Sequence, residues 1–390
     1  MSRPAVIMGL QPAGLALARS LGRRDVHVTG ISFERADFGL ASRYVRTRRL
    51  ILDGDDGAVL ETIRAAASQE PIALVPERDA HVDFVLRHWD DLRELAAIPL
   101  PDDRTATAAL RDKNGLAEVA EKAGVAVPRT VAVESEDDLD GGPLPRPYLL
   151  KPLESERYAA AFSEKVVVVE NAEQAVAAWR RAQEAGFELF AQDFVPGSTD
   201  RILSLFVYIG RSGSPLASVV GRKVRQGPPG FGASTIFAVE FDEEVLEVGL
   251  RLLSSVDYRG FAHVELVRDP RDRELKLLEV NTRLPVWGGV AMSRYYDLGP
   301  VAYADLCGEA AEPLPPFRRS VTWTYLAKDL VTLTRLARRR RLDLRRVAPP
   351  YLGDHVPAVR ARDDLAPVGA LLRWGIGRAG DKVRVAKRSS

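Results

Sequence analysis

The stretch "GFAHVELVRDPRDRELKLLEVNTRLP", residues 260–285, consists of two alternating apolar segments around a polar centre. Strand side chains repeat every two residues, so "FAHVELV" and "LKLLEVN" predict two strands, and "RDPRDRE" predicts the turn between them. If this hairpin is symmetrical about Asp272, Glu265 lies directly opposite Glu279, and like charges at opposed positions repel each other. Something positively charged must therefore meet these two carboxylates.

One candidate for that charge is a divalent cation. On the second strand, Leu277, Glu279 and Asn281 are predicted to share one face. Two carboxylates and an amide oxygen form an all-oxygen ligand set that suits Mg²⁺, with phosphate oxygens completing its octahedron. The alternative is an edge strand whose carboxylates face water, as most strand carboxylates do. The hairpin alone leaves both interpretations open.

The composition is that of an ordinary globular protein. The chain has 390 residues, 46% of them hydrophobic and 28% charged, which predicts two or three domains. Its net charge of +1 gives no overall reason to expect nucleic acid as a partner. Cys307 is the only cysteine, which excludes an intramolecular disulfide and a CxxC site. Neither a signal-peptide pattern nor an apolar run of about 18 residues is found, so the cytoplasm is the expected compartment.

Residues 1–104 are predicted to form a doubly wound α/β domain. The segments "AVIMG", "LQPAGLALARSLGRR" and "VHVTGIS" are typical of a strand, a helix and a parallel strand. The turn "GLQPAG" precedes a helix N-terminus, where backbone N–H groups favour anions. We interpret it either as a site for a substrate carboxylate or as a structural turn.

Three further segments follow. Residues 105–197 are predicted to begin with one helix closed by Gly124 and to continue as a small α+β lobe. Residues 198–312 are rich in strand patterns and contain the hairpin. Residues 313–390 form a basic extension with the run Arg335–Arg346. The expected fold class is thus α/β and α+β.

Three lysines that could meet a nucleoside triphosphate precede the hairpin. Lys113 lies in the predicted helix, Lys151 ends the strand "PYLL", and Lys165 follows a polar loop and begins the strand "VVVV". Bound phosphates require cations of this kind. A single such lysine is more often solvated than functional, but three in this order before a metal hairpin favour a nucleotide site.

The order of "RDKNGLAEVAEKAGVAVPRT", "YLLKPL", "FAQDFVPGSTD" and the hairpin resembles the ATP-grasp superfamily, in its branch of carboxylate–amine ligases that includes D-aspartate ligase. The resemblance covers residues 1–312 and implies a two-lobed ATP-grasp fold after the N-terminal domain. It implies an ADP-forming ligase that activates a small carboxylic acid as an acyl phosphate and joins it to an amine. An amino acid is expected on at least one side of the new bond.

The resemblance also implies roles for single residues. Glu265, Glu279 and Asn281 would bind Mg²⁺, or Mn²⁺ in its place. Arg283 would face the transferred phosphate or the acceptor carboxylate, and Arg222 would add positive charge beside it. The residues expected to hold ATP are Lys113, Lys151, Lys165, Gln192, Asp193, Val195, Asp200, Lys223 and Arg225.

Within that set, the backbone of residues 192–195 would bind the adenine edge, and Asp200 would hold the ribose. Lys165 would replace the glycine-rich phosphate loop of many relatives, since no glycine follows the "KP" strand here. His263 stands where some relatives carry Arg. It is either a substrate contact or a strand histidine satisfied by its neighbours.

Other functions remain as alternatives. A non-catalytic ATP-binding sensor or scaffold would not need the complete metal set, and a nicotinamide-dependent oxidoreductase would not explain the hairpin. The basic run Arg335–Arg346 is interpreted as a solvated or salt-bridged helix face, with nucleic acid or an anionic lipid headgroup as the alternative partner. The amphipathic segment "WTYLAKDLVTLTRLARR" adds weak peripheral membrane contact as a hypothesis. The resemblance also implies a homodimer.

Overall fold

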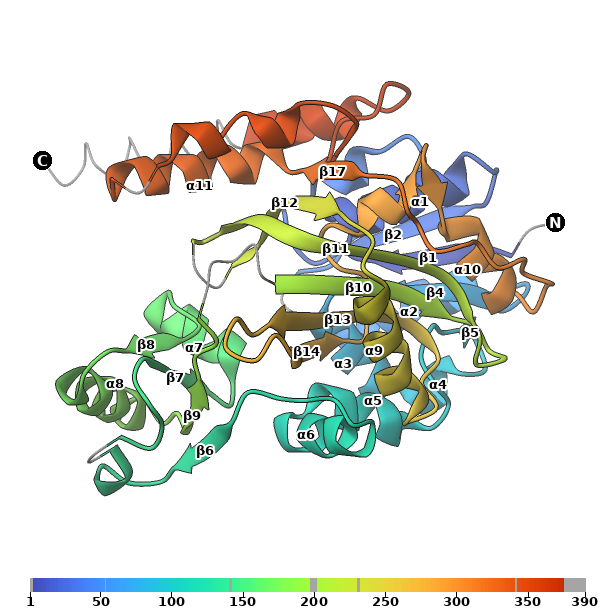
Figure 1. Cartoon of the computed structure of the whole chain (residues 1–390). Coiled ribbons are helices and arrows are strands. Elements are labelled where there is room, and N and C mark those ends of the chain that lie inside the picture. Colours follow the sequence, from blue (N-terminus) through green and yellow to red (C-terminus); the bar gives the residue numbers. More distant parts are fainter. Residues whose placement is uncertain are drawn as a thin grey trace, which may run out of the picture.

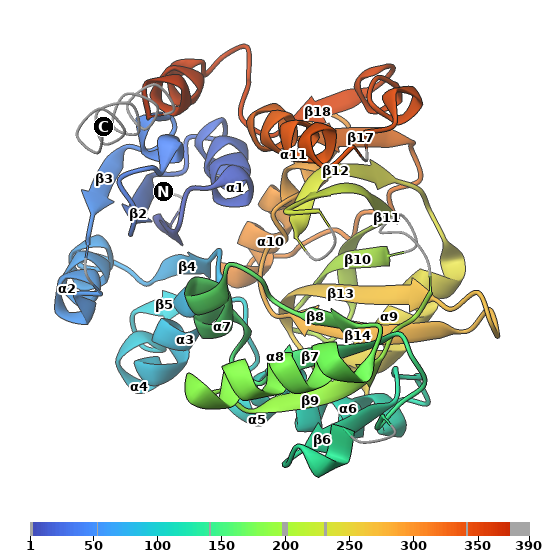
Figure 2. The same cartoon turned by 90° about the vertical axis from the view of Figure 1, so that its left-hand side faces the viewer.

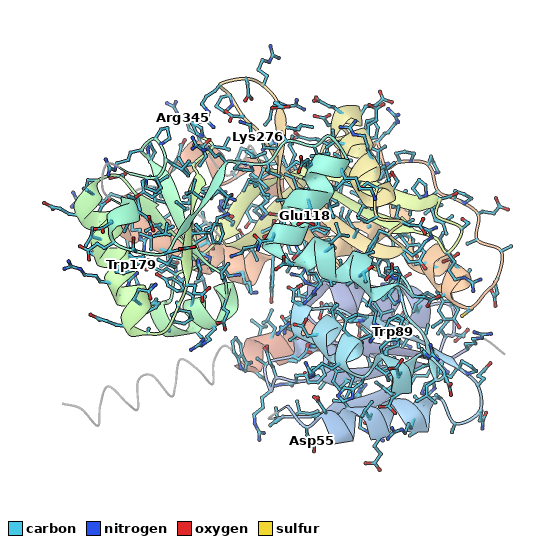
Figure 3. All side chains as sticks on the ribbon, turned by 90° about the horizontal axis from the view of Figure 1, so that it is seen from below. Asp55, Trp89, Glu118, Trp179, Lys276 and Arg345 are labelled. Atoms are coloured by element: carbon cyan, nitrogen blue, oxygen red, sulfur yellow. The ribbon has the colours of Figure 1, made fainter. Side chains whose placement is uncertain are left out.

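A computed structural model shows a chain in three connected parts (Figure 1). An N-terminal α/β domain packs beside a core lobe, and a small lid with its own sheet projects from the core. Seen from below, Trp179 marks the lid and Trp89 marks the N-terminal domain (Figure 3). The structure describes residues 3–52, 54–139, 142–196, 202–229, 232–340 and 342–374.

The N-terminal domain is built on a five-stranded parallel sheet with strand order β3-β2-β1-β4-β5. All four residues of β1 are buried between its parallel neighbours β2 and β4. A strand that is buried on both faces reads as a continuous apolar run, as "AVIM" does. The predicted parallel-sheet domain is confirmed. Its elements are β1 (Ala5–Met8), α1 (Pro12–Gly22), β2 (Val28–Ser32), β3 (Thr47–Leu50), α2 (Asp56–Ala66), β4 (Ile72–Pro76), α3 (Asp79–Arg87), α4 (Trp89–Leu92) and β5 (Ala96–Ala97).

The segment after this domain contains two helices where one is predicted. α5 (Arg104–Arg111) ends at Asp112, and α6 (Lys113–Lys122) begins at the next residue. Asp112 has an extended backbone, and its carboxylate accepts a hydrogen bond from Gly115 N at 2.9 Å. It is therefore an N-cap that interrupts the helix. This break fixes Lys113 at the first position of α6.

The lid is a four-stranded sheet with strand order β6-β9-β7-β8, accompanied by two helices. The prediction of a polar loop before Lys165 is wrong, because residues 155–162 form helix α7. Its Tyr158 is buried and packs against the rings of Phe162 and Phe187. Such apolar contacts stabilise this short helix, which would be only marginally stable in isolation. The lid elements are β6 (Thr130–Val133), β7 (Tyr148–Pro152), α7 (Ser155–Phe162), β8 (Val167–Val169), α8 (Ala172–Glu184) and β9 (Leu189–Asp193).

The core lobe carries a seven-stranded sheet with strand order β14-β13-β10-β11-β12-β17-β18. On one face, Val207 and Val264 belong to the same buried cluster as Leu252 of α9 and Val119 of α6. The strands from β14 to β12 in this order pair antiparallel, which allows short connections such as the hairpin. The elements up to residue 306 are β10 (Ile202–Ile209), β11 (Pro215–Gly227), β12 (Ala233–Val239), α9 (Glu243–Ser254), β13 (Gly260–Arg268), β14 (Leu275–Asn281), β15 (Met292–Ser293), β16 (Tyr296–Asp297) and α10 (Gly299–Leu306).

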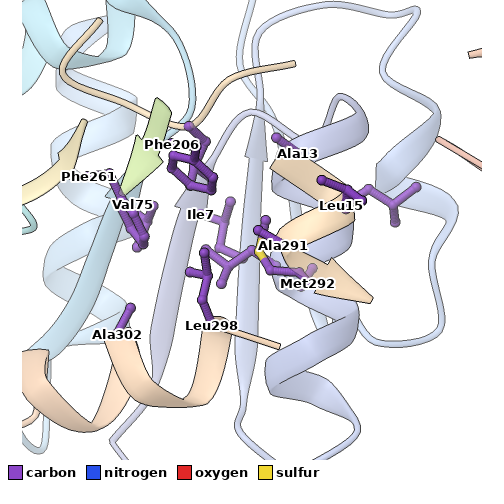
Figure 4. Close-up of a cluster of buried hydrophobic side chains, with 14 of the residues drawn as sticks. Ile7, Ala13, Leu15, Val75, Phe206, Phe261, Ala291, Met292, Leu298 and Ala302 are labelled. Atoms are coloured by element: carbon purple, nitrogen blue, oxygen red, sulfur yellow. The ribbon is translucent and has the colours of Figure 1, made fainter. Parts of the chain in front are cut away.

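The N-terminal domain packs on the opposite face of this sheet. Phe206 and Phe261 of the core belong to the same buried cluster as Ile7 and Val75 of the N-terminal domain (Figure 4). Burial of apolar surface of this kind is the main force that holds such layers together. The contact brings the loops at the carboxyl end of the parallel sheet toward the hairpin.

The C-terminal extension is continuous with the core lobe. β17 (Val321–Thr324) pairs with β12, and β18 (His355–Pro357) pairs with β17. Between them, α11 (Leu326–Arg338) packs on β11 and β12. Farther along, Asp364 forms a buried ion pair with Arg19 of α1 at 2.8 Å, which joins the extension to the N-terminal domain. No helix in the described part of the chain is long and apolar enough to cross a membrane.

Candidate active site

The hairpin has the central pairing that the sequence predicts. β13 and β14 are antiparallel, and Glu265 pairs directly with Glu279. At the next step a β-bulge makes Leu266 the partner of Leu277. The prediction that Leu277 shares a face with Glu279 is wrong, because the bulge turns Leu277 into the apolar core on the other side. The two acids stay opposed at the surface of the sheet.

A lysine supplies part of the positive charge that the acids require. Lys223 of β11 places Nζ 2.8 Å from both carboxylate oxygens of Glu265, and both side chains are buried. Burial by itself lowers the pKa of Lys223, but attraction to Glu265 and Glu279 raises it overall, so the ammonium stays charged. Burial raises the pKa of Glu265 despite this lysine, and Glu279 adds to the effect. The acid pair therefore still attracts a further cation.

Glu279, Asn281 and Arg283 form a chain of hydrogen bonds at the edge of the sheet. Asn281 Nδ2 donates to Glu279 Oε1 at 3.0 Å, and Arg283 Nη2 donates to Asn281 Oδ1 at 3.0 Å. Arg283 Nη2 also lies 2.6 Å from Asp79 Oδ2 of the N-terminal domain. Desolvation raises the pKa of Glu279, but Lys223, Asn281 and Arg283 outweigh it and lower the pKa overall. Glu279 is thus held ionised at the edge of the sheet.

The lid contributes a lysine to the same region. Lys151 at the end of β7 donates a hydrogen bond to Gln192 Oε1 of β9 at 2.6 Å. Burial lowers the pKa of Lys151, while the charges of Glu279 and Glu265 act in the opposite direction. The structure therefore brings Lys151 of the lid within electrostatic reach of the acid pair of the core.

A second lysine lies beside Lys151. Lys113 Nζ is 4.1 Å from the ring centroid of Phe190 and donates to the backbone oxygen of Pro152. Burial, followed by repulsion from Lys151, lowers the pKa of Lys113 to about 8, against a weaker attraction from Asp112. Two lysines that repel each other in a desolvated region are stabilised by an incoming polyanion such as a triphosphate.

ATP affinity is accordingly expected to weaken as the pH rises through about 8. Phosphate binding favours the charged lysine, and above its pKa the free protein must take up a proton before it binds. The dissociation constant should then rise by up to about tenfold per pH unit, as calorimetric titration with ATP can measure. Lys113→Arg should weaken this dependence markedly, because a guanidinium stays charged, while Lys122→Arg on the same helix should retain it. An unchanged dependence of the dissociation constant on pH in the Lys113→Arg variant would contradict a role for Lys113 in binding the phosphates.

Other residues predicted for nucleotide binding have different surroundings. Asp193 pairs with Arg271 of the hairpin turn at 2.6 Å, which ties the lid strand to the core. Val195 lies half-buried just beyond the end of β9. Lys165 is exposed on the turn between α7 and β8. Asp200 lies outside the described residues.

Two of the three predicted cations of β11 lie away from the acid pair. Side chains alternate along a strand, so Arg222 points to the opposite face from Lys223, where it pairs with Glu240 at 2.8 Å. β-Bulges follow, and the buried Arg225 forms an ion pair with Asp329 of α11. Of the three, only Lys223 meets Glu265.

His263 adjoins the acid pair. It pairs with Asn281 across the hairpin, and its Nε2 lies 3.4 Å from Glu265 Oε1 without hydrogen-bond geometry. Within the described part of the chain, neither ring nitrogen has a hydrogen-bond partner. Burial, followed by the charges of Lys223 and Arg283, lowers the pKa of His263, so the ring is neutral. Both interpretations of His263 remain open on this geometry.

Comparisons with known proteins fit this geometry. No family model matches the chain. D-aspartate ligase of Enterococcus faecium (strain Aus0004) is 27% identical over 217 residues, which make up 53% of this chain and 51% of that protein. The chain thus spans about half the length of this curated relative.

Two solved structures share the arrangement of elements. The ADP complex of PurK, N5-carboxyaminoimidazole ribonucleotide synthetase, matches 83% of this chain and 81% of its own with a TM-score of 0.62 and 15% identity. L-amino acid ligase from Bacillus licheniformis matches 80% of this chain and 75% of its own, with a TM-score of 0.57 and 18% identity. The chain has the ATP-grasp fold. Its lid and core lobe are the two lobes of that fold.

The hairpin of this ATP-grasp fold suits a magnesium ion. In the described part of the chain, no group of three or more His, Cys, Asp or Glu side chains is placed to hold a metal. The donor set is instead the pair Glu265 and Glu279 with the amide of Asn281. Mg²⁺ takes few protein ligands and keeps phosphate and water oxygens for the rest. Two opposed acids, one of them paired with a lysine, therefore fit this ion.

The N-terminal domain adds charged residues that our sequence reasoning missed. Glu77, Arg78 and Asp79 follow β4 directly, at the carboxyl edge of the parallel sheet. Ligands of open α/β sheets bind outside this edge. A run of charged residues directly after a buried strand was therefore the sequence signal that could have identified these residues. Asp79 binds Arg283, and Arg78 forms an ion pair with Glu34.

Glu77 decides between the two interpretations of the "GLQPAG" turn. Its carboxylate accepts hydrogen bonds from Gly14 N at 2.8 Å and Gln11 N at 3.0 Å. Burial, followed by repulsion from Asp37, raises the pKa of Glu77 to about 7. An internal carboxylate thus occupies the N-terminus of α1, which favours the structural role of this turn.

Proposed function

We propose that the chain is an ATP- and Mg²⁺-dependent ligase that joins a small carboxylic acid to an amine and releases ADP and phosphate. One observation carries the proposal. The ionised Glu279, linked through Asn281 to Arg283, lies on the face of the core sheet within electrostatic reach of Lys151 from the lid. A non-catalytic ATP binder would have no need for a complete acid, amide and cation set.

The first step makes the carboxylate reactive. A carboxylate oxygen of the acid attacks the γ-phosphorus of ATP, the bond to the β-phosphate oxygen breaks, and ADP leaves with the electron pair. The chain's contribution is to position the groups and neutralise charge, because this transfer needs no protein nucleophile. Lys113 and Lys151 would bind the phosphates, and Arg283 would bind the transferred group or the acid. Mg²⁺ held by Glu265, Glu279 and Asn281 would offset the charge of the triphosphate.

The second step forms the amide. The amine nitrogen attacks the acyl carbon, the bond to the phosphate oxygen breaks, and phosphate leaves while the nitrogen loses a proton. Acyl phosphates react readily with water, so the reacting groups must be shielded. The lid is the element suited to this role, since Arg271 of the hairpin already pairs with Asp193 of the lid.

The small-molecule substrates are proposed to bind between Arg283 and the loops of the N-terminal domain. Lys328, in the first turn of α11, experiences the charges of Arg78 and Glu34. Desolvation, followed by repulsion from Arg78, lowers the pKa of Lys328, and an anionic group placed between them would relieve that repulsion. Cations for a carboxylate and acids for an ammonium group in one place favour an amino acid as one of the substrates.

Substrate-stimulated ADP release tests this function. The purified chain would be incubated with ATP and Mg²⁺ and with pairs drawn from a panel of amino acids, hydroxy acids and small amines. We expect at least one pair to stimulate release well above either compound alone, with phosphate formed in equal amount. ATP binding without stimulated turnover for every pair would favour the sensor or scaffold alternative.

The compartment and assembly state are part of the proposal. The reaction is proposed to take place in the cytoplasm, where ATP is available and where a buried free thiol such as Cys307 stays reduced. Homodimerisation stays a prediction, and sedimentation velocity would check it.

A further inference from the structure

Charge is distributed unequally along the chain. Residues 313–390 contain 18 Lys and Arg but six Asp and Glu, a net charge of +12. The whole chain has a net charge of +1, which leaves −11 for residues 1–312. The near-neutral total therefore conceals a strongly basic extension attached to an acidic enzyme body. Such asymmetry points to an anionic partner for the extension alone.

Exposed apolar side chains are concentrated in the same segment. Twelve large hydrophobic residues are exposed in the described part of the chain, and eight of them lie between residues 326 and 374. Scattered exposed leucines need no explanation, but a concentration of this kind marks an interaction surface. The eight are Leu326, Leu330, Val331, Leu344, Leu352, Leu365, Leu372 and Trp374.

Helix α11 separates its two faces clearly. Asp329 and Thr332 are buried against the core sheet. Leu330 and Val331 are 54% and 53% exposed on the other side, in the same helix as the exposed Arg335 and Arg338. Side chains three or four positions apart lie on neighbouring parts of a helix surface, so Val331, Arg335 and Arg338 occupy one outward face. Arginine stems can lie along an apolar layer while their charged ends stay in water.

These elements also lie on one side of the molecule. In two views at right angles, α11 and the red helix of residues 366–374 both run along the upper edge (Figures 1 and 2). The lid and the hairpin lie below them in Figure 1. A flat, extended partner could therefore contact both helices without covering the site.

We propose that this upper face, formed by α11 and residues 342–374, docks on an anionic membrane surface. The apolar side chains enter the boundary between headgroups and acyl chains, and the arginines meet the lipid phosphates. Since no described helix can span a bilayer, the contact is peripheral. The inference does not depend on the ligase activity.

A second copy of the chain is the less suitable partner. In a twofold dimer each face meets an identical face, so its arginines need acids on the same surface. Within this face Asp329 and Asp364 are buried, the exposed Asp354 and Asp363 are already paired with Arg319 and Arg23, and Asp343 accepts a hydrogen bond from Arg345 N. Two such faces would therefore oppose like charges, whereas anionic lipid provides the complementary charge.

Vesicle flotation with the full chain tests the proposal. The probes are phosphatidylcholine vesicles with and without about 30% phosphatidylglycerol, at ionic strengths of about 0.1 M and 0.5 M. We expect binding only to the anionic vesicles and loss of most of it at the higher salt concentration. Leu326→Ser/Leu330→Ser/Val331→Ser and Arg338→Glu/Arg339→Glu should each reduce the bound fraction at least about fivefold.

Matched changes elsewhere provide the controls. Leu50→Ser/Val127→Ser replaces exposed apolar residues outside the face, and Arg64→Glu replaces an exposed arginine of α2. Both should float like the unmodified chain, and circular dichroism should show all variants folded. Absence of binding to anionic vesicles would overturn the proposal, as would equal losses in the control variants. A concentration-dependent dimer that the triple serine variant abolishes, without any lipid binding, would assign the face to a second copy instead.

Discussion

Glu279→Gln is expected to lower substrate-stimulated ADP release by about a thousandfold, which corresponds to about 4 kcal/mol of transition-state stabilisation. The substitution keeps the shape of the side chain but removes the negative charge, which Lys223 and Arg283 stabilise by lowering the pKa of Glu279. It leaves Glu265 with its lysine, so the pair can no longer hold a second cation. Initial rates at saturating ATP, measured over a range of Mg²⁺ concentrations, would report the loss.

The control for this change lies on the same hairpin. Glu274 is exposed in the turn, five residues along the chain from Glu279 and nine from Glu265. Glu274→Gln removes the same charge from the hairpin and should change the rate less than about twofold. If Glu279→Gln turned over like the unmodified chain, these acids would not form the metal site.

Arg283→Lys is expected to lower kcat/KM for the acid by about a hundredfold. Arg283 binds Asn281 and Asp79 at the same time, and so it joins the metal hairpin to the N-terminal domain. A lysine keeps the positive charge but lacks the planar fork that reaches both partners. Asp79→Asn should produce part of the same loss. The transition-state stabilisation lost in the double variant should be smaller than the sum of the two single losses, because the residues act as a unit.

Arg268→Lys serves as the comparison for this arginine. Arg268 ends β13 and pairs with Glu244 and Asp242 at the surface. Surface ion pairs contribute little, so this variant should retain nearly full activity. Additive losses for Arg283→Lys and Asp79→Asn would mean that the two residues act separately.

The sequence predicts the acid pair because strand alternation and a short turn leave few possible registers. Glu265 and Glu279 are opposed as predicted, and the parallel N-terminal sheet follows from continuous apolar strands such as β1 and β4. The bulge that redirects Leu277 has no sequence signal, because a strand with one extra apolar residue cannot be distinguished in the sequence from a regular strand.

Charged residues near the pair are harder to assign from the sequence. Arg222, Lys223 and Arg225 are equally basic and nearly adjacent, yet their partners are Glu240, Glu265 and Asp329. Strand faces and bulges decide which cation meets which acid, and the chain order shows neither. Asp79 was missed because it is separated from Arg283 by 204 residues and meets it only through domain packing.

The position of an oxygen label tests the central claim most directly. With the active acid labelled with ¹⁸O in its carboxylate, one labelled oxygen should leave in the inorganic phosphate, because the acyl carbon to oxygen bond breaks when the amine attacks. Mass spectrometry of the phosphate, with Glu279→Gln as the blank, would measure the transfer. Labelled phosphate formed in step with ADP is the predicted result. Unlabelled phosphate formed together with the amide product, whose second carboxylate oxygen would then have left by another route, would contradict activation through an acyl phosphate.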